Sequence, residues 1–277
     1  FNDNWNSASE RWDATTDDAN YHDNVDMFAL MVPLTFDGVK VTPWVMYAAM
    51  GPGMFDNWGN DDFSAGNAWT RASRGMTSGF TGTDPLDSYG NAFWAGVTGE
   101  VTYWDPFRIA WDVNYGSASY EDQKMNREGW LASLLLEYKL DWGTPGIFGW
   151  YSSGDDGNVK NGSERMPTMS GCANFMSFMG DGNYGWGDPR LYDRNLTYAG
   201  TWGVGLRIHD MSFVEDLKHS FRVAYWGGTN SPAMAKYVKD AYGWDNGTPE
   251  GPYLTTNDGL LEFNLVNSYQ IYENLEA

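Results

Sequence analysis

The chain has 277 residues, of which 17% are aromatic, 19% are charged and 33 are glycine, and its formal net charge is −20. This composition favours strands and turns over helices, because aromatic side chains suit pleated surfaces and glycine suits turns. The negative charge argues against a nucleic-acid partner and favours cations. The single cysteine, Cys172, excludes a disulfide framework and a CxxC zinc site. The sequence has no run of eighteen apolar residues that would predict a transmembrane helix.

Nine runs of strand-forming residues, most of them with alternating apolar and polar positions, predict nine β-strands in one domain, residues 1–277. Asp37-Gly38 predicts a two-residue hairpin turn between the first two strands. Pro33 and Pro43 cannot donate to a ladder, so they predict a bulge or a distortion in this pair. Residues 1–25 are polar and acidic and are expected to form a loop. In chain order the nine runs span residues 26–36, 39–50, 93–103, 107–115, 130–140, 147–153, 198–208, 220–226 and 259–270.

The run FRIAWDVNY, residues 107–115, shows the alternation most clearly. Its odd positions are bulky and apolar, from Phe107 to Tyr115, and its even positions are small or polar, including Arg108 and Asp112. Successive side chains of a strand point to opposite faces, so this strand has one apolar face and one polar face. An antiparallel sheet on a soluble core and a membrane barrel with a watery lumen both produce this pattern.

The connections between the runs distinguish these two folds. Short turns alternate with long loops along the whole chain, and the long segments are 51–90, 154–195 and 227–256. A bacterial outer-membrane barrel has short periplasmic turns and long extracellular loops, whereas a soluble sandwich has no reason to sort its connections by length. The runs of about 8–12 residues also match the ~9–11 residues that a tilted strand needs to cross a bilayer. Aromatic residues near the strand ends suit interfacial girdles: Trp104, Tyr115, Trp130, Tyr138, Trp142, Tyr198 and Trp226.

The sequence therefore predicts an all-β fold, a transmembrane antiparallel β-barrel. Nine strands cannot close an even-stranded barrel, so we expect a partial barrel whose first and last strands lie outside this chain and which has about 16 strands when complete. Eight charged residues on the polar faces are expected to line the pore, where facing acidic and basic groups filter solutes by charge. They are Glu100, Arg108, Asp112, Glu137, Lys139, Arg207, Arg222 and Glu262.

Four segments resemble the homotrimeric outer-membrane porins of sulfate-reducing bacteria: NGSERMP (161–167), SFVEDLKHSFRVAYWGGTN (212–230), TTND (255–258) and SYQIYENL (268–275). The resemblance is clearest over residues 161–275, and before that it is mainly one of strand pattern. It implies a homotrimer of diffusion barrels in the bacterial outer membrane, in contact with lipid and lipopolysaccharide. It implies no catalytic residues and no cofactor. The expected function is passive diffusion of small hydrophilic solutes and ions.

Two features predict how the channel filters its solutes. The hairpin of residues 27–50 is apolar on both faces, so either a long loop folds inward over it or it lies at a subunit interface. Acidic residues are concentrated in the expected loops and would give the mouth a preference for cations. These loop residues are Asp13, Asp17, Asp18, Asp23, Asp56, Asp61, Asp62, Asp155, Asp156, Asp181 and Asp188.

The remaining motifs predict neither a ligand site nor catalysis. Residues 180–185 match GxGxxG, but no strand precedes them and no helix follows, so a flexible loop is expected. Residues 155–164 have the composition of a calcium loop, but Lys160 stands where an oxygen ligand is needed. The three histidines lack metal-ligand spacing and no nucleophile–base motif is present, so neither a metal site nor catalysis is expected. The rival hypothesis is a secreted, aromatic-rich protein that binds or cleaves glycans, because fifteen tryptophans and paired carboxylates suit both tasks.

Overall fold

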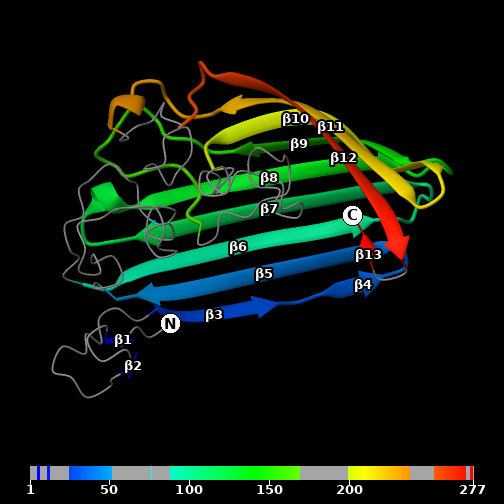
Figure 1. The fold of residues 1–277 in the computed structure, drawn as a ribbon. Coiled ribbons are helices and arrows are strands. Elements are labelled where there is room, and N and C mark those ends of the chain that lie inside the picture. The colour runs from blue at the N-terminus through cyan, green and yellow to red at the C-terminus, as the bar shows by residue number, and fades with distance from the viewer. Residues whose placement is uncertain are drawn as a thin grey trace.

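The computed structural model describes residues 25–51, 76, 88–168, 199–237 and 253–272, together with the short strands at 5–6, 11–12 and 275–276. These residues form an all-β structure dominated by one strongly curved antiparallel sheet of eleven strands (Figure 1). Its strands follow chain order from β3 to β13, and β4 pairs with β5 beside β3. Among the described strands no pairing joins the β12–β13 end to the β3–β4 end, so the sheet is open.

The strands of this sheet lie close to the nine predicted runs. They are β3 (Val25–Met31), β4 (Leu34–Phe36), β5 (Val39–Met50), β6 (Gly90–Val101), β7 (Phe107–Ser119), β8 (Arg127–Tyr138), β9 (Thr144–Ser152), β10 (Thr201–Val214), β11 (Leu217–Gly228), β12 (Gly259–Tyr272) and β13 (Leu275–Glu276). Two single-turn 3-10 helices, Gln123–Met125 and Ala235–Tyr237, lie in the connections. No helix among the described residues is long and apolar enough to cross a membrane.

The distortion predicted at Pro33 is confirmed, because the first run is broken at Val32-Pro33 into β3 and β4. Two other details of the predicted elements were wrong. The connection expected between the runs 198–208 and 220–226 is mostly strand: β10 extends to Val214, β11 begins at Leu217, and only Glu215 and Asp216 form the turn, where Asp216 has a φ of 63°. The stretch expected to be a loop at the N-terminus contains two two-residue strands that pair with each other, β1 (Trp5–Asn6) and β2 (Arg11–Trp12).

The ladder register sorts the side chains of the large sheet onto two faces, which we call concave and convex. On the concave face lie Thr42, Thr98, Asp112 and Ser133, which are partners in one row across β5–β8. Large aromatic side chains on this face pack over glycines on the neighbouring strand. The register pairs Trp44 with Gly96, Trp94 with Gly116, Phe148 with Gly205 and Trp150 with Gly203.

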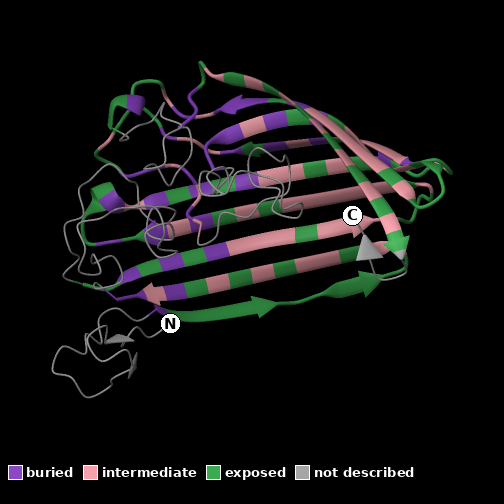
Figure 2. Ribbon diagram, in the orientation of Figure 1, coloured by how far each residue is buried: buried purple, intermediate pink, exposed green. Residues whose placement is uncertain are grey.

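Buried side chains are concentrated near the end of the sheet where the long connections attach, as Figure 2 shows in purple over β5–β8. One cluster combines concave-face residues of β5–β7 with Met76, which belongs to the 51–90 segment. A second cluster contains Leu131, Phe148, Trp150, Trp226 and Leu254. The core is therefore built on the concave face, at the loop end of the sheet.

The aromatic–glycine pairs lead to a stability prediction. A Cβ at Gly203 would overlap the Trp150 ring, which is buried and donates from Nε1 to Thr201 Oγ1 at 3.0 Å. We expect Gly203→Ala to lower the free energy of unfolding by about 1–3 kcal/mol through overpacking. Gly157→Ala is the matched control, since its Cβ would meet no atom closer than Ser231 Oγ at 3.9 Å. Urea unfolding followed by tryptophan fluorescence measures both; equal midpoints would contradict this account of the pair.

Candidate functional site

The eight charged residues expected to line a pore fall on one side of the sheet. Register partners share a face, and Glu100, Asp112, Glu137, Arg207 and their partners all belong to the concave one. Arg222 is the partner of Arg207, and Glu262 is the partner of Ala224. Lys139 follows β8 and borders a hollow of about 400 Å³ at the turn end together with Arg108, Glu137 and Arg207.

Five of the concave-face side chains form a continuous series of ion pairs, which we call the charge ladder: Lys40, Glu100, Arg108, Glu137 and Arg207. Glu100 accepts from Lys40 Nζ at 2.8 Å and from Arg108 Nε at 3.0 Å. Glu137 accepts from Arg108 Nη1 at 2.7 Å and from Arg207 Nη2 at 2.5 Å. Because each carboxylate lies between two cations, the ladder holds a chain of charges across β5–β10 in fixed positions.

A glycine allows the ladder to cross strand β9. Gly146 is the register partner of both Glu137 on β8 and Arg207 on β10. A Cβ at Gly146 would lie 2.8 Å from the Glu137 Cγ. The missing side chain therefore leaves the space through which Glu137, only 7% exposed, reaches Arg207.

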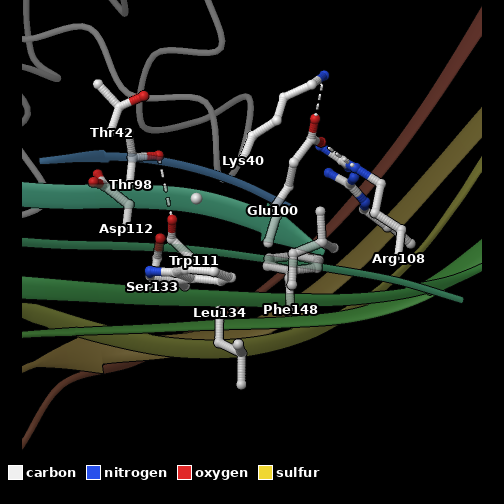
Figure 3. A pocket seen from close by; sticks show the side chains of 14 residues that line it. Lys40, Thr42, Thr98, Glu100, Arg108, Trp111, Asp112, Ser133, Leu134 and Phe148 are labelled. Atoms are coloured by element: carbon white, nitrogen blue, oxygen red, sulfur yellow. Dashed lines mark hydrogen bonds and ion pairs between the residues drawn. The ribbon is translucent and has the colours of Figure 1, made fainter. Parts of the chain in front are cut away.

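A hollow of about 620 Å³ adjoins the ladder on the concave face. Figure 3 shows its two ends: Thr42, Thr98, Asp112 and Ser133 at one, and Lys40, Glu100 and Arg108 at the other. Ala110, Leu135 and Phe148 continue the register row of Lys40 and Glu100, and this row lies between the row of Asp112 and the row of Arg108. Asp112 accepts from Asn114 Nδ2 at 2.6 Å. The hollow is large enough for a small solute and has polar groups at both ends.

The beginning of the 154–195 connection lies against the concave face. Trp94 Nε1 donates to the Pro167 carbonyl at 2.8 Å, and a Cβ at Gly116 would lie 3.0 Å from Pro167. At Gly129 a Cβ would overlap the Glu164 carbonyl. Residues 163–167 therefore cover the loop end of β6–β8, and Met76 covers part of β5 nearby.

This arrangement bears on the hairpin that is apolar on both faces. Ala48 and Met50 of β5 are buried in the cluster that includes Met76, so the β5 side is covered. On β3 both faces stay exposed, with Phe28 at 71% and Met31 at 65%. Each of the two alternatives drawn from the sequence thus agrees with one strand of the hairpin. A segment folded inward agrees with the burial of β5, and a contact surface agrees with the exposure of β3.

A buried cluster, which we call the loop clasp, holds the connections together: Asp155, Ser163, Arg165 and Tyr253. Asp155 pairs with Arg165 Nε at 3.2 Å, and the two side chains are 0% and 6% exposed. Tyr253 Oη donates to Asp155 Oδ2 at 2.5 Å, and the Ser163 hydroxyl donates to Oδ1. Asn230 adds a second link, because it accepts from the Asp155 N–H and donates to the Leu254 carbonyl.

The clasp accounts for the segment with the composition of a calcium loop. Asp155 is bonded to the clasp, and Glu164 accepts from the Asp156 N–H and from Asn161 Nδ2. Burial raises the pKa of Glu164; the hydrogen bond from the Asp156 N–H opposes this effect, and the negative charge of Asp156 adds to it. Among the described residues no group of three or more His, Cys, Asp or Glu side chains could hold a metal ion. The GxGxxG segment 180–185 and Cys172 lie outside the described residues.

The convex face is apolar and exposed. Side chains in the middle of its strands, such as Leu134 at 49%, Leu206 at 54% and Phe263 at 66%, have no cover within the described chain. Aromatic rows flank this apolar band. They contain five of the seven aromatic residues predicted near the strand ends, whereas Trp226 is buried in the concave-face cluster and Tyr198 lies outside the described residues. Toward the loop end are Tyr47, Phe93, Tyr115, Trp130, Tyr151 and Tyr225, and toward the turn end are Phe36, Trp104, Phe107, Tyr138, Trp142 and Phe213.

Contacts within these rows order the aromatic rings. Trp130 stacks on Tyr151 with ring centroids 5.2 Å apart, and Phe107 meets Tyr138 edge-on at 4.7 Å. The Tyr115 hydroxyl donates to Glu128 at 2.6 Å, a residue nearer the loop end. Each ring therefore has an apolar body beside the band, and the Tyr115 hydroxyl bonds on the polar side, as expected at a boundary between apolar and aqueous surroundings.

Sequence reasoning missed Lys40 and the clasp. Lys40 could have been found from the sequence, because residues 39–50 alternate and Lys40 stands at one of the alternate positions whose side chains lie on the concave face. The clasp residues come from connections far apart in the chain, and no local pattern joins Asp155 to Tyr253. No protein-family model matches this chain, and no curated protein matches it.

Proposed function

We propose that this chain forms the wall of an outer-membrane β-barrel channel, a porin, through which small hydrophilic solutes and ions diffuse passively. In this proposal the convex face meets lipid and the concave face lines a water-filled lumen. The observation that carries it is the exposed apolar band on one face of a sheet whose other face bears the charge ladder. In water such a large exposed apolar surface would be costly, whereas in a bilayer it is the lipid contact.

The aromatic rows support the same proposal. Phe107 and Tyr115 face the convex side eight residues apart, which is about 27 Å along a strand. This length is on the scale of the ~25 Å apolar band of outer-membrane barrels, whose two edges carry aromatic girdles. The tight turns would then lie on the periplasmic side and the long connections on the extracellular side. The proposal also includes a complete barrel of about 16 strands, contact with lipopolysaccharide and a homotrimer. The homotrimer rests on the sequence resemblance alone.

The proposal predicts a cation preference that depends on salt. The chain carries 37 acidic and 17 basic residues, and the wall charges pair with one another, so the acidic connections set the potential at the mouth. Asp155 does not contribute, because it is paired with Arg165; Asp156 is exposed, and the other nine acidic residues predicted for the loops lie outside the described residues. We expect reversal potentials under a KCl gradient to show cation preference at about 0.01 M salt that fades near 1 M as screening shortens. Anion preference at low salt would contradict this filter.

Single-channel recording tests the channel itself. Protein extracted with detergent and added to a planar bilayer is expected to give stepwise, ohmic conductance. A protein that stays in solution without detergent and gives no steps would overturn the proposal. The secreted glycan-active alternative predicts that soluble behaviour. The carboxylates Glu100 and Glu137, each bound to two cations of the ladder, do not suit the acid/base pair that glycan cleavage would require.

A further inference from the structure

The 620 Å³ hollow has a charge pattern that selects one class of solute. At the ladder end, the three cations Lys40, Arg108 and Arg207 face two carboxylates, which leaves one positive charge in excess. At the other end Asp112 contributes one negative charge. Among the described residues its only hydrogen-bond donor is Asn114, a neutral amide. The hollow is therefore neutral as a whole but charged oppositely at its two ends.

Both ends keep the capacity to bind a ligand. Arg108 binds Glu100 and Glu137 through Nε and Nη1, and within the described chain its Nη2 has no partner. Arg207 uses Nε and Nη2 for Glu137, so its Nη1 can likewise donate to a carboxylate. Around Asp112, the hydroxyls of Thr42, Thr98 and Ser133 lie in the same register row. They can accept hydrogen bonds from the same ammonium group as Asp112.

The separation of the two ends sets the length of the ligand. Asp112 and Arg108 lie on the concave side of the same strand, four residues apart, which is about 13 Å between Cα atoms. The Arg108 guanidinium leans toward Asp112, because it bonds Glu100, whose register partner is Ala110. An extended peptide of two or three residues spans roughly 7–10 Å. Between the ends, Ala110, Leu135 and Phe148 offer an apolar floor to short side chains.

We propose that this hollow binds short peptides with free termini, the amino group at Asp112 and the carboxylate at Arg108 and Arg207. The inference deepens the proposed channel by naming a substrate class for it, and it rests on that function for the route by which the peptide arrives. Binding at this wall slows the peptide as it passes, so the peptide is expected to reduce the single-channel current reversibly.

The test compares three compounds of nearly equal size: Ala-Ala, N-acetyl-Ala-Ala and Ala-Ala amide. In the parent protein Ala-Ala is expected to block the current at a concentration roughly fivefold lower than either capped peptide, since it alone makes both charge-assisted contacts. Asp112→Asn and Lys40→Gln are each expected to remove this preference. Asp210→Asn is the matched control for Asp112→Asn: it also removes one carboxylate, but from β10 and outside the hollow, and it places asparagine at a positive φ that it tolerates.

The outcomes separate this inference from the channel. Equal block by all three compounds in a conducting parent overturns the peptide site and leaves the channel intact. A preference that survives Asp112→Asn also overturns it, because the site would then lie elsewhere. If the protein gives no conductance, the channel proposal fails. Calorimetric titration of the detergent-solubilised protein with the three compounds then tests the peptide site. Tighter binding of Ala-Ala than of either capped peptide supports the site, and equal binding of the three overturns it.

Discussion

Replacing Asp155 by asparagine is expected to loosen the long connections that the clasp joins while leaving the sheet folded. The substitution keeps the shape of the side chain but removes the carboxylate that Arg165 pairs with in a buried site, where the two groups are 0% and 6% exposed. Removing one partner of a buried ion pair costs about 3–5 kcal/mol. Tyr253 and Ser163 also lose a charged acceptor, so their hydrogen bonds weaken.

Limited proteolysis and amide hydrogen exchange measure this loosening. Cleavage within residues 153–168, 229–237 and 253–258 should rise at least tenfold, as expected when local opening becomes easier by more than about 1.4 kcal/mol. Asp156→Asn is the neighbouring control, because that side chain is exposed and, within the described part of the chain, accepts only from the local groups Asn158 N and Asn161 Nδ2. If the two variants are cleaved at the same rate, the clasp does not hold the connections together.

Arginine in place of Leu134 is expected to impair insertion into lipid. Leu134 lies in the middle of the apolar band with 49% of its surface exposed and nothing in the described chain to cover it. A lipid-facing arginine near the midplane of a barrel costs about 2–4 kcal/mol. The fraction folded into vesicles, read from the shift of the unboiled protein on a gel, should fall accordingly.

The adjacent residue provides the control for this variant. Ser133 is the register partner of Asp112 and borders the hollow on the concave face, where an arginine would meet water. Ser133→Arg should therefore insert far better than Leu134→Arg. Equal insertion of the two variants would mean that the two faces of β8 do not differ in their surroundings.

The alternation of side chains predicted the strands because it depends only on local geometry. Each of the nine runs lies in the large sheet, the first of them divided between β3 and β4. Residues 107–115 divide between the faces as expected, with Asp112 on the concave side and Phe107, Val113 and Tyr115 exposed on the other. Strand ends were less predictable. Irregular pairing between Ile208 and Val214 allows β10 to continue past the point where its alternation fades.

The contacts of the wall charges followed only in part from the sequence. Alternation gives the face of Glu100, Arg108 and Glu137, but which cation meets which carboxylate depends on the register between strands. Glu137 reaches Arg207 across β9 because Gly146 has no side chain, and this effect is visible only once β8, β9 and β10 are aligned. The clasp depends on chain segments about a hundred residues apart, as in the bond between Tyr253 and Asp155, and no periodic pattern brings these together.

In the proposed channel one face of the sheet meets lipid and the other meets water. Single cysteines at Ser133 and Leu134, in a chain whose Cys172 is replaced by serine, test it most directly in protein reconstituted into vesicles. The cysteine at 133 should react with a membrane-impermeant thiol reagent. The cysteine at 134 should resist that reagent, and a fluorophore attached to it before reconstitution should be quenched by nitroxides on the lipid chains. Equal reaction at both positions, or reaction at 134 without lipid quenching, would contradict the claim.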